Sequence, residues 1–127
     1  MDEAKAFTDL ADSMITFRGT VYPWQCDHMG HMNVMWYAGR FDEATWQLLG
    51  MIGLTSTYMQ VNQRRMVAVQ QNTSFMRELL AGSLIIIRSE ILEMREEVIN
   101  FSHQMIDLES NETAAKSILS GVHLSVE

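Results

Sequence analysis

A single segment with the period of an amphipathic helix lies in a chain whose other long segments resemble strands. From residue 34 onward, apolar side chains recur at the three- and four-residue spacing of one helix face. This stripe comprises Val34, Tyr37, Ala38, Phe41, Thr45, Leu48 and Leu49. Asn33 stands where an N-cap is expected, and Gly50 and Gly53 mark the end of the helix. One long helix must therefore bury its stripe against the strands that surround it in the sequence.

The strand-like segments lie on both sides of the helix. A first strand is expected from Ser13 to Trp24, a stretch rich in β-branched and aromatic residues that stops near Pro23. Residues 54–62 favour a short helical or irregular connection. Four extended segments follow at about residues 65–77, 83–94, 98–107 and 113–126. The breaks between them predict hairpins at Ala81-Gly82, Arg95-Glu96 and Ser110-Asn111.

This order of elements predicts an α+β fold. A curved antiparallel β-sheet wrapped around one long central helix would bury the helix stripe and one face of each strand in a two-layer core. A chain of 127 residues has the size of one domain, so we expect a single domain over residues 1–127. Its 47% hydrophobic content and single proline are typical of a compact protein without a disordered tail.

Charge and hydropathy exclude several partners. A net charge of -7 disfavours binding to nucleic acid or to anionic lipid. The longest strongly apolar run, Leu84 to Ile87, is far too short to span a membrane, and the acidic N-terminus does not resemble a signal peptide. A single cysteine, Cys26, agrees with a reducing compartment. We therefore expect a cytoplasmic protein with no nucleic-acid or membrane partner.

A motif between the first strand and the helix carries the functional signal. The stretch from Val21 to Tyr37, followed by Phe41-Asp-Glu-Ala44, resembles the 4-hydroxybenzoyl-CoA thioesterase-like family, whose pattern is Asp-x-x-Gly-His-x-Asn-x-x-x-Tyr and then Phe-Glu-x-Ala. The residues that match in register are Asp27, Gly30, His31, Asn33, Tyr37, Phe41 and Ala44. A weaker match runs from Phe75 to Gly82, whereas Gln25 and Cys26 replace the Asp-Thr that is common before the key aspartate.

The resemblance implies a hotdog fold and the hydrolysis of an acyl-CoA, with Asp27 as the nucleophile or general base. The unpaired amides of the first helical turn, near Val34, would bind the developing oxyanion. The remaining site residues would be His31 and Asn33, which orient Asp27 or its loop, and Trp24, Gly30 and Tyr37, which contact the substrate. The resemblance implies no cofactor beyond the CoA of the substrate. It also implies a homodimer or homotetramer with the site between subunits, as the exposed edge of a curved sheet predicts independently.

Other interpretations of the same residues remain open. Asp27 could simply cap a turn, and Tyr37 could belong to the core alone. Cys26, Asp27, His28 and His31 include metal-ligand atoms, although no second cluster with metal-site spacing is present, so no metal is expected. Cys26 could act as a nucleophile with a histidine base. On the helix, Asp42 is the better rival carboxylate, because Glu43 lies on the face opposite the apolar stripe.

The substrate and reaction class also have alternatives. A hotdog hydratase or dehydratase, or a non-catalytic module that binds acyl thioesters, would share the fold. Aromatic residues near the motif could surround a quaternary ammonium, so betainyl-CoA is one candidate substrate, with Trp24 lining its pocket. The arginines that could bind the CoA phosphates are Arg64, Arg65, Arg77 and Arg88.

Overall fold

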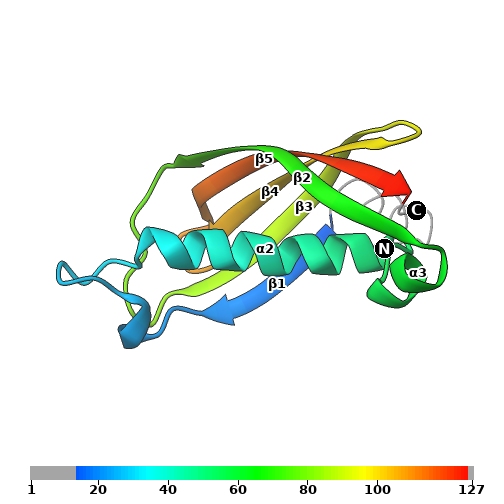
Figure 1. Ribbon diagram of the computed structural model, residues 1–127. Helices are drawn as coiled ribbons and strands as arrows, with labels where there is room; N and C mark the ends of the chain where they lie inside the picture. Colours follow the sequence, from blue (N-terminus) through cyan, green and yellow to red (C-terminus); the bar gives the residue numbers. More distant parts are fainter. Residues whose placement is uncertain (1–13, 126–127) are drawn as a thin grey trace, which may run out of the picture.

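One antiparallel sheet of five strands curves around a single long helix in the computed structural model, which describes residues 14–125 (Figure 1). The elements are β1 (Met14–Thr20), a 3-10 turn η1 (Pro23–Gln25), α2 (Val34–Met51), α3 (Ser56–Val61), β2 (Arg64–Phe75), β3 (Leu84–Met94), β4 (Val98–Asp107) and β5 (Glu112–Ser125). The predicted order of one strand, one long helix and four antiparallel strands is confirmed. The outer ends of the first and last predicted strands, Ser13 and Val126, lie outside the described residues, as does the acidic N-terminal segment.

The sheet order is β1-β3-β4-β5-β2, which corrects one of the three predicted hairpins. The hairpins at Arg95-Glu96 and Ser110-Asn111 are confirmed, since β3 pairs with β4 and β4 pairs with β5. The hairpin at Ala81-Gly82 is wrong, because β2 pairs with β5 and not with β3. Gly82 does make a turn there, with φ +91°, but its N–H donates to Val21 O at 2.8 Å and so attaches the turn to the segment after β1.

The first strand also ends earlier than predicted. Thr20 is its last residue, and Pro23 opens the η1 turn that redirects the chain toward α2. Proline is well suited to this position because its fixed φ fits the first residue of a helical turn and it needs no N–H acceptor there.

The apolar stripe of α2 is buried on one side only. Tyr37, Phe41, Leu48 and Leu49 are buried, as their spacing predicts, and Ala44, which is outside the predicted stripe, is buried with them. Val34 and Ala38 are not, and Val34 is 60% exposed. Ala38 and Val34 each line a cavity whose wall also includes residues of β2. This side of the helix is therefore separated from the edge strand by these two cavities.

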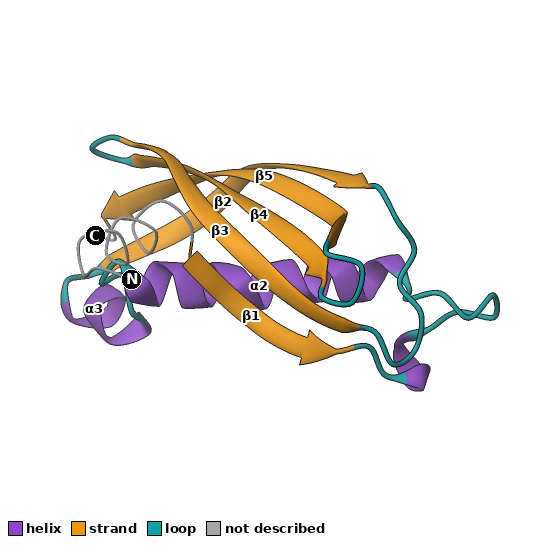
Figure 2. Cartoon of the chain, turned by 180° about the vertical axis from the view of Figure 1, so that it is seen from behind, coloured by secondary structure: helices purple, strands orange, loops and turns teal. Residues whose placement is uncertain are grey.

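The core lies between α2 and the concave face of the sheet, and the view from behind shows the sheet covering the length of the helix (Figure 2). One buried cluster surrounds the N-terminal half of the helix and includes Phe41, Ile87 and Met105. A second cluster, around Leu48 and Phe101, lies toward its C-terminal end. Neither α2 nor α3 is long and apolar enough to cross a membrane.

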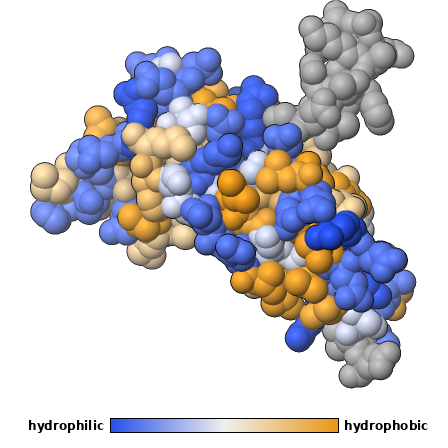
Figure 3. Space-filling view, turned by 90° about the horizontal axis from the view of Figure 1, so that it is seen from above, coloured by the Kyte–Doolittle hydropathy of each residue, from blue (hydrophilic) through white to orange (hydrophobic). Residues whose placement is uncertain are grey.

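Several strands carry large apolar side chains that are exposed to solvent. Apolar and hydrophilic groups alternate in patches over the face seen from above (Figure 3). The large apolar residues exposed on the strands include Val69, Phe75, Leu84, Leu92 and Ile118. Two of these residues, Val69 and Phe75, belong to β2, which is a twelve-residue strand at the edge of the sheet.

Candidate active site

A tight loop connects η1 to α2 and carries most of the motif residues. Gln25 closes the base of this loop, because its buried side chain accepts the Tyr22 N–H at 2.9 Å and its carbonyl accepts the Asn33 N–H at 2.9 Å. Within the loop, Asp27 N–H bonds to His31 O at 2.8 Å, and Gly30 N–H bonds to Asp27 O at 3.0 Å. Gly30 has φ +83°, a conformation that favours glycine. The loop projects beyond the start of α2 (Figure 1).

The two carboxylate oxygens of Asp27 have different surroundings. Its Oδ1 accepts the backbone N–H of Met29 at 2.8 Å and of His31 at 3.3 Å, which is the turn-capping role open to any loop aspartate. No partner for Oδ2 is found among residues 14–125. The Met29 amide, and to a lesser degree the amide and imidazole of His31, lower the pKa of Asp27. One oxygen therefore holds the carboxylate in place and ionised, while the other is free to react.

The start of α2 presents a free amide, as its sequence predicts. Asn33 is confirmed as the N-cap, since its Oδ1 accepts the Met35 N–H at 3.0 Å and its carbonyl accepts the Trp36 N–H at 2.9 Å. Within the described part of the chain, no acceptor is found for the Val34 N–H. The positive end of the helix dipole lies at the same place, so this amide is suited to bind an oxyanion.

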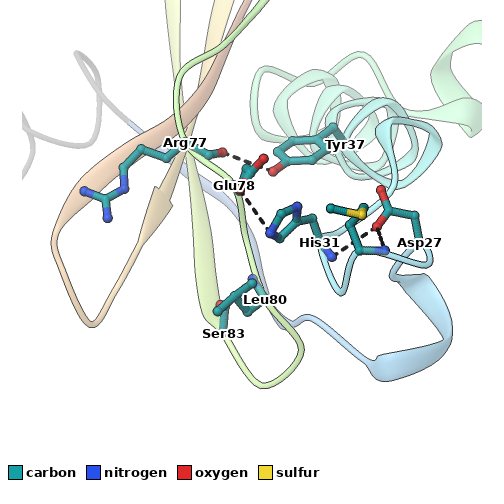
Figure 4. Close-up of polar contacts among 8 residues, drawn as sticks. Asp27, His31, Tyr37, Arg77, Glu78, Leu80 and Ser83 are labelled. Atoms are coloured by element: carbon teal, nitrogen blue, oxygen red, sulfur yellow. Dashed lines mark hydrogen bonds and ion pairs between the residues drawn. The ribbon is translucent and has the colours of Figure 1, made fainter.

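An open cavity of about 420 Å³ joins these groups. Its wall consists of Asp27, His31, Met32, Val34, Tyr37, Phe75, Met76, Arg77 and Glu78. The Tyr37 ring is buried and in edge-to-face contact with Phe75, while its hydroxyl donates to Arg77 O at 3.3 Å (Figure 4). Burial also raises the pKa of Tyr37. Four predicted site residues, Asp27, His31, Val34 and Tyr37, thus share one cavity.

Three predicted site residues lie outside the cavity wall. Asn33 caps the helix beside it, and Gly30 forms the turn of the loop. Trp24 is 65% exposed, stacks on Tyr22 with ring centroids 5.7 Å apart, and makes an edge contact with Trp36 at 5.0 Å. The face of Trp36 is already in contact with a cation, because the Arg40 guanidinium lies 5.7 Å from its ring centroid.

Glu78 is a site residue that the sequence did not single out. Its carboxylate Oε2 lies 3.0 Å from Nε2 of His31, and both residues line the cavity (Figure 4). The only sequence signal was the weak family-like segment from Phe75 to Gly82. Nothing in that segment marks Glu78 as a residue of the site. The pairing depends on an isolated antiparallel bridge between His31 and Leu80, which joins segments almost fifty residues apart.

The rival residues lie elsewhere. Asp42 is exposed at a second cavity of about 280 Å³, lined by α2, α3, β2, β4 and β5, whose other lining residues are mainly apolar. Glu43 pairs with Arg40 at 3.6 Å on the outer side of the helix. The Cys26 thiol contacts Tyr22 O at 3.7 Å and does not line the first cavity. Within residues 14–125, no group of three or more His, Cys, Asp or Glu side chains could hold a metal ion.

Of the four arginines proposed for CoA phosphates, only Arg77 lines the first cavity, and its guanidinium pairs with Glu112. Arg64 donates to His123 Nε2 at 3.3 Å. Arg65 and Arg88 are exposed on β2 and β3.

Comparison with known proteins agrees with the fold described above, a curved antiparallel sheet around one long helix. A family model described as the thioesterase-like superfamily matches residues 21–127. No curated protein matches significantly. A hypothetical protein from Staphylococcus aureus, solved in complex with CoA, superposes with a TM-score of 0.82 at 15% identity over 87% of this chain and 70% of that chain.

Two further solved structures are thioesterases. A 1,4-dihydroxy-2-naphthoyl-CoA thioesterase from Synechocystis has a TM-score of 0.77 and 14% identity, covering 91% of this chain and 83% of that chain. A DHNA-CoA thioesterase from Staphylococcus aureus has a TM-score of 0.77 and 12% identity, covering 89% and 74%. At these identities the likeness concerns the fold.

Proposed function

This chain belongs to the thioesterase-like superfamily and has its hotdog fold, and from that premise we propose that it hydrolyses an acyl-CoA thioester to the free acid and CoA. One observation carries the proposal. Asp27, whose Oδ2 is free, and Val34, whose N–H is unpaired, line the same cavity at the positive end of a long helix. Thioester hydrolysis requires this combination of an electron-pair donor and an oxyanion donor.

The proposed reaction places the thioester carbonyl oxygen against the Val34 N–H. Asp27 Oδ2 attacks the carbonyl carbon, the C–S bond breaks, and CoA leaves as a thiolate that takes a proton from solvent. Water then hydrolyses the resulting mixed anhydride and regenerates the carboxylate. The lowered pKa of Asp27 keeps the carboxylate ionised at neutral pH, which both direct attack and general-base activation of water require.

A hydratase or dehydratase is the second candidate, because the cavity contains a histidine and carboxylates, the groups that such a reaction needs around the β-carbon of its substrate. The His31–Glu78 pair is the specific observation in its favour. A non-catalytic module that binds acyl-CoA would use the same cavity without turnover.

We further propose a homodimer or homotetramer with the site between subunits, in the cytoplasm. The long edge strand β2 has unpaired backbone groups on one side and exposed apolar side chains. Asp27 lies close to this edge, across the cavity from Phe75 of β2, and it is exposed in a single subunit. Light scattering should give at least twice the mass of one chain, and a monomer at micromolar concentration would count against a shared site.

The acyl group of the substrate is the next question. Betainyl-CoA remains a candidate through the aromatic side chains before the loop, although Trp24 does not line the cavity of Asp27. The substrate class is testable with Trp24→Ala. If this variant and the wild type hydrolyse neutral and trimethylammonium acyl-CoAs with the same preference, Trp24 has no part in recognising a cation.

The test of the proposed function is thiol release by the wild-type protein from short, long, aromatic and trimethylammonium acyl-CoAs. Release from at least one substrate is the expected result. A change in the enoyl absorbance of hydroxyacyl-CoA without thiol release would show a hydratase or dehydratase. Measured affinity for acyl-CoA without either reaction would show a binding module.

A further inference from the structure

The loop that carries Asp27 has few contacts with the rest of the protein. Residues 27–30 are all exposed, and their hydrogen bonds remain within the loop. Besides the backbone bridge of His31 to Leu80, the one side-chain hydrogen bond or ion pair within residues 14–125 that links loop residues 27–31 to another segment joins His31 to Glu78. Exposed loops with so few contacts open readily, so this pair is placed to limit the motion of the loop.

Glu78 stands on a backbone that is well anchored. The neighbouring Leu79 is buried, and its carbonyl accepts the Met32 N–H at 2.7 Å. On the other side, Arg77 N–H bonds to Ala114 O at 3.1 Å, and Arg77 O accepts the Tyr37 hydroxyl. The segment that carries Glu78 is therefore attached to α2, to β5 and to the end of the loop.

A continuous series of contacts leads from Glu78 to the reacting carboxylate. Glu78 Oε2 lies 3.0 Å from the imidazole Nε2 of His31, and the backbone N–H of His31 donates to Asp27 Oδ1 at 3.3 Å. A displacement of His31 would change the orientation of the Asp27 carboxylate and hence the position of its free Oδ2 (Figure 4).

We infer that Glu78 is a positioning residue of the proposed thioesterase site, which holds His31 and through it the loop and carboxylate of Asp27. The inference rests on the proposed function. Global stability is not its role, because exposed ion pairs contribute little to stability, and the Glu78 side chain is 71% exposed. Its contribution is to geometry, where a misplacement of about 1 Å can cost a large factor in rate.

The test compares three variants in steady-state thiol release. Glu78→Ala should lower kcat about tenfold or more, with KM changed less than about threefold, because positioning is lost while the cavity remains. Glu78→Gln keeps an acceptor for His31 Nε2–H and should recover a large part of kcat. The matched control is Glu93→Ala, which breaks another exposed ion pair, with Arg95 at 2.9 Å on the distant β3–β4 hairpin, and should leave kcat unchanged.

A double-mutant cycle shows whether Glu78 acts through His31. In a His31→Gln background, Glu78→Ala should have little further effect, whereas an undiminished loss would show that Glu78 acts by another route and would overturn the inference. Equal kcat for Glu78→Ala and wild type would overturn it as well.

Hydrogen exchange separates this inference from the proposed function, since it requires no turnover. Glu78→Ala should speed exchange of the Met29 and His31 amides severalfold, and Glu93→Ala should not. Faster exchange without turnover on any acyl-CoA would leave the loop contact established and the proposed reaction refuted. Unchanged exchange in an active protein would refute the role of Glu78 alone.

Discussion

His103 provides a prediction whose magnitude follows directly from its surroundings. It is fully buried between Phe41 and Phe101, and its two ring nitrogens belong to a series of hydrogen bonds that crosses the core. Nδ1 lies 2.6 Å from Ser89 Oγ, which lies 2.7 Å from Thr16 Oγ1. Nε2 lies 2.8 Å from Thr45 Oγ1 on α2.

The hydrogen bonds determine the tautomer of this histidine. The Thr45 hydroxyl donates to Phe41 O at 3.0 Å, so it must accept from His103, and Nε2 carries the proton. Nδ1 then accepts from the Ser89 hydroxyl. This arrangement satisfies a neutral imidazole, whereas a buried cation would be poorly solvated, and burial accordingly lowers the pKa of His103 to about 4.

The sign of the pH dependence follows from this difference. The unfolded chain takes up a proton at His103 below about pH 6.5, but the folded protein does not until the pH nears 4. The unfolded state therefore binds more protons in this window, and stability falls as the pH is lowered through it. At about 1.4 kcal/mol for each pKa unit, the loss between pH 7 and pH 4.5 is roughly 2 kcal/mol from this residue alone.

The assay is urea unfolding at both pH values and one protein concentration, with wild type, His103→Gln and His28→Gln. Wild type and His28→Gln, whose altered side chain is exposed in the loop, should lose about 2 kcal/mol more than His103→Gln on acidification. The same pH dependence in all three proteins would refute the argument, because His103 would then be free to accept a proton in the folded state.

Three other outcomes are expected. Asn33→Ala removes the side-chain acceptor for the Met35 N–H and should lower the free energy of unfolding by about 1 kcal/mol, measured by urea titration, whereas exposed Gln47→Ala should change it far less. Leu48→Ala creates a cavity in the second core cluster and should cost about 3 kcal/mol, against less than about 1 kcal/mol for the half-exposed Ile118→Ala. Direct attack by Asp27 forms a mixed anhydride, so after repeated turnover in H₂¹⁸O we expect ¹⁸O in the peptide that contains Asp27 when water adds to its Asp27 carbonyl, whereas an Asp27 that only activates water leaves that peptide unlabelled.

The sequence predicted the helices and strands better than it predicted which strands pair in the sheet. The spacing of Tyr37, Phe41 and Leu48 reports a local property, the period of a helix, and the structure confirms it. The order of strands in a sheet is a long-range property, and the turn signal at Ala81-Gly82 does not say which strand β2 will pair with. The predicted hairpin at that turn was wrong for this reason.

The same distinction applies to the site. Asp27, His31 and Asn33 lie within one short segment, so a local motif could place them together, and the role of Asn33 as N-cap is confirmed. Glu78 reaches the cavity only because a distant segment forms a bridge with the loop at His31. Trp24 is close to Asp27 in sequence, but η1 turns it toward Tyr22 and Trp36, away from the cavity wall.

The central claim is that Asp27 acts on the thioester carbonyl at the start of α2. The most direct test is kcat/KM for the best acyl-CoA substrate, measured for folded Asp27→Asn and for Asp42→Asn, which makes the same change at the second cavity. We predict a loss of at least about 100-fold for Asp27→Asn and a small change for Asp42→Asn. Near-wild-type activity of Asp27→Asn, with the large loss in Asp42→Asn, would contradict the claim and move the reaction to the helix carboxylate.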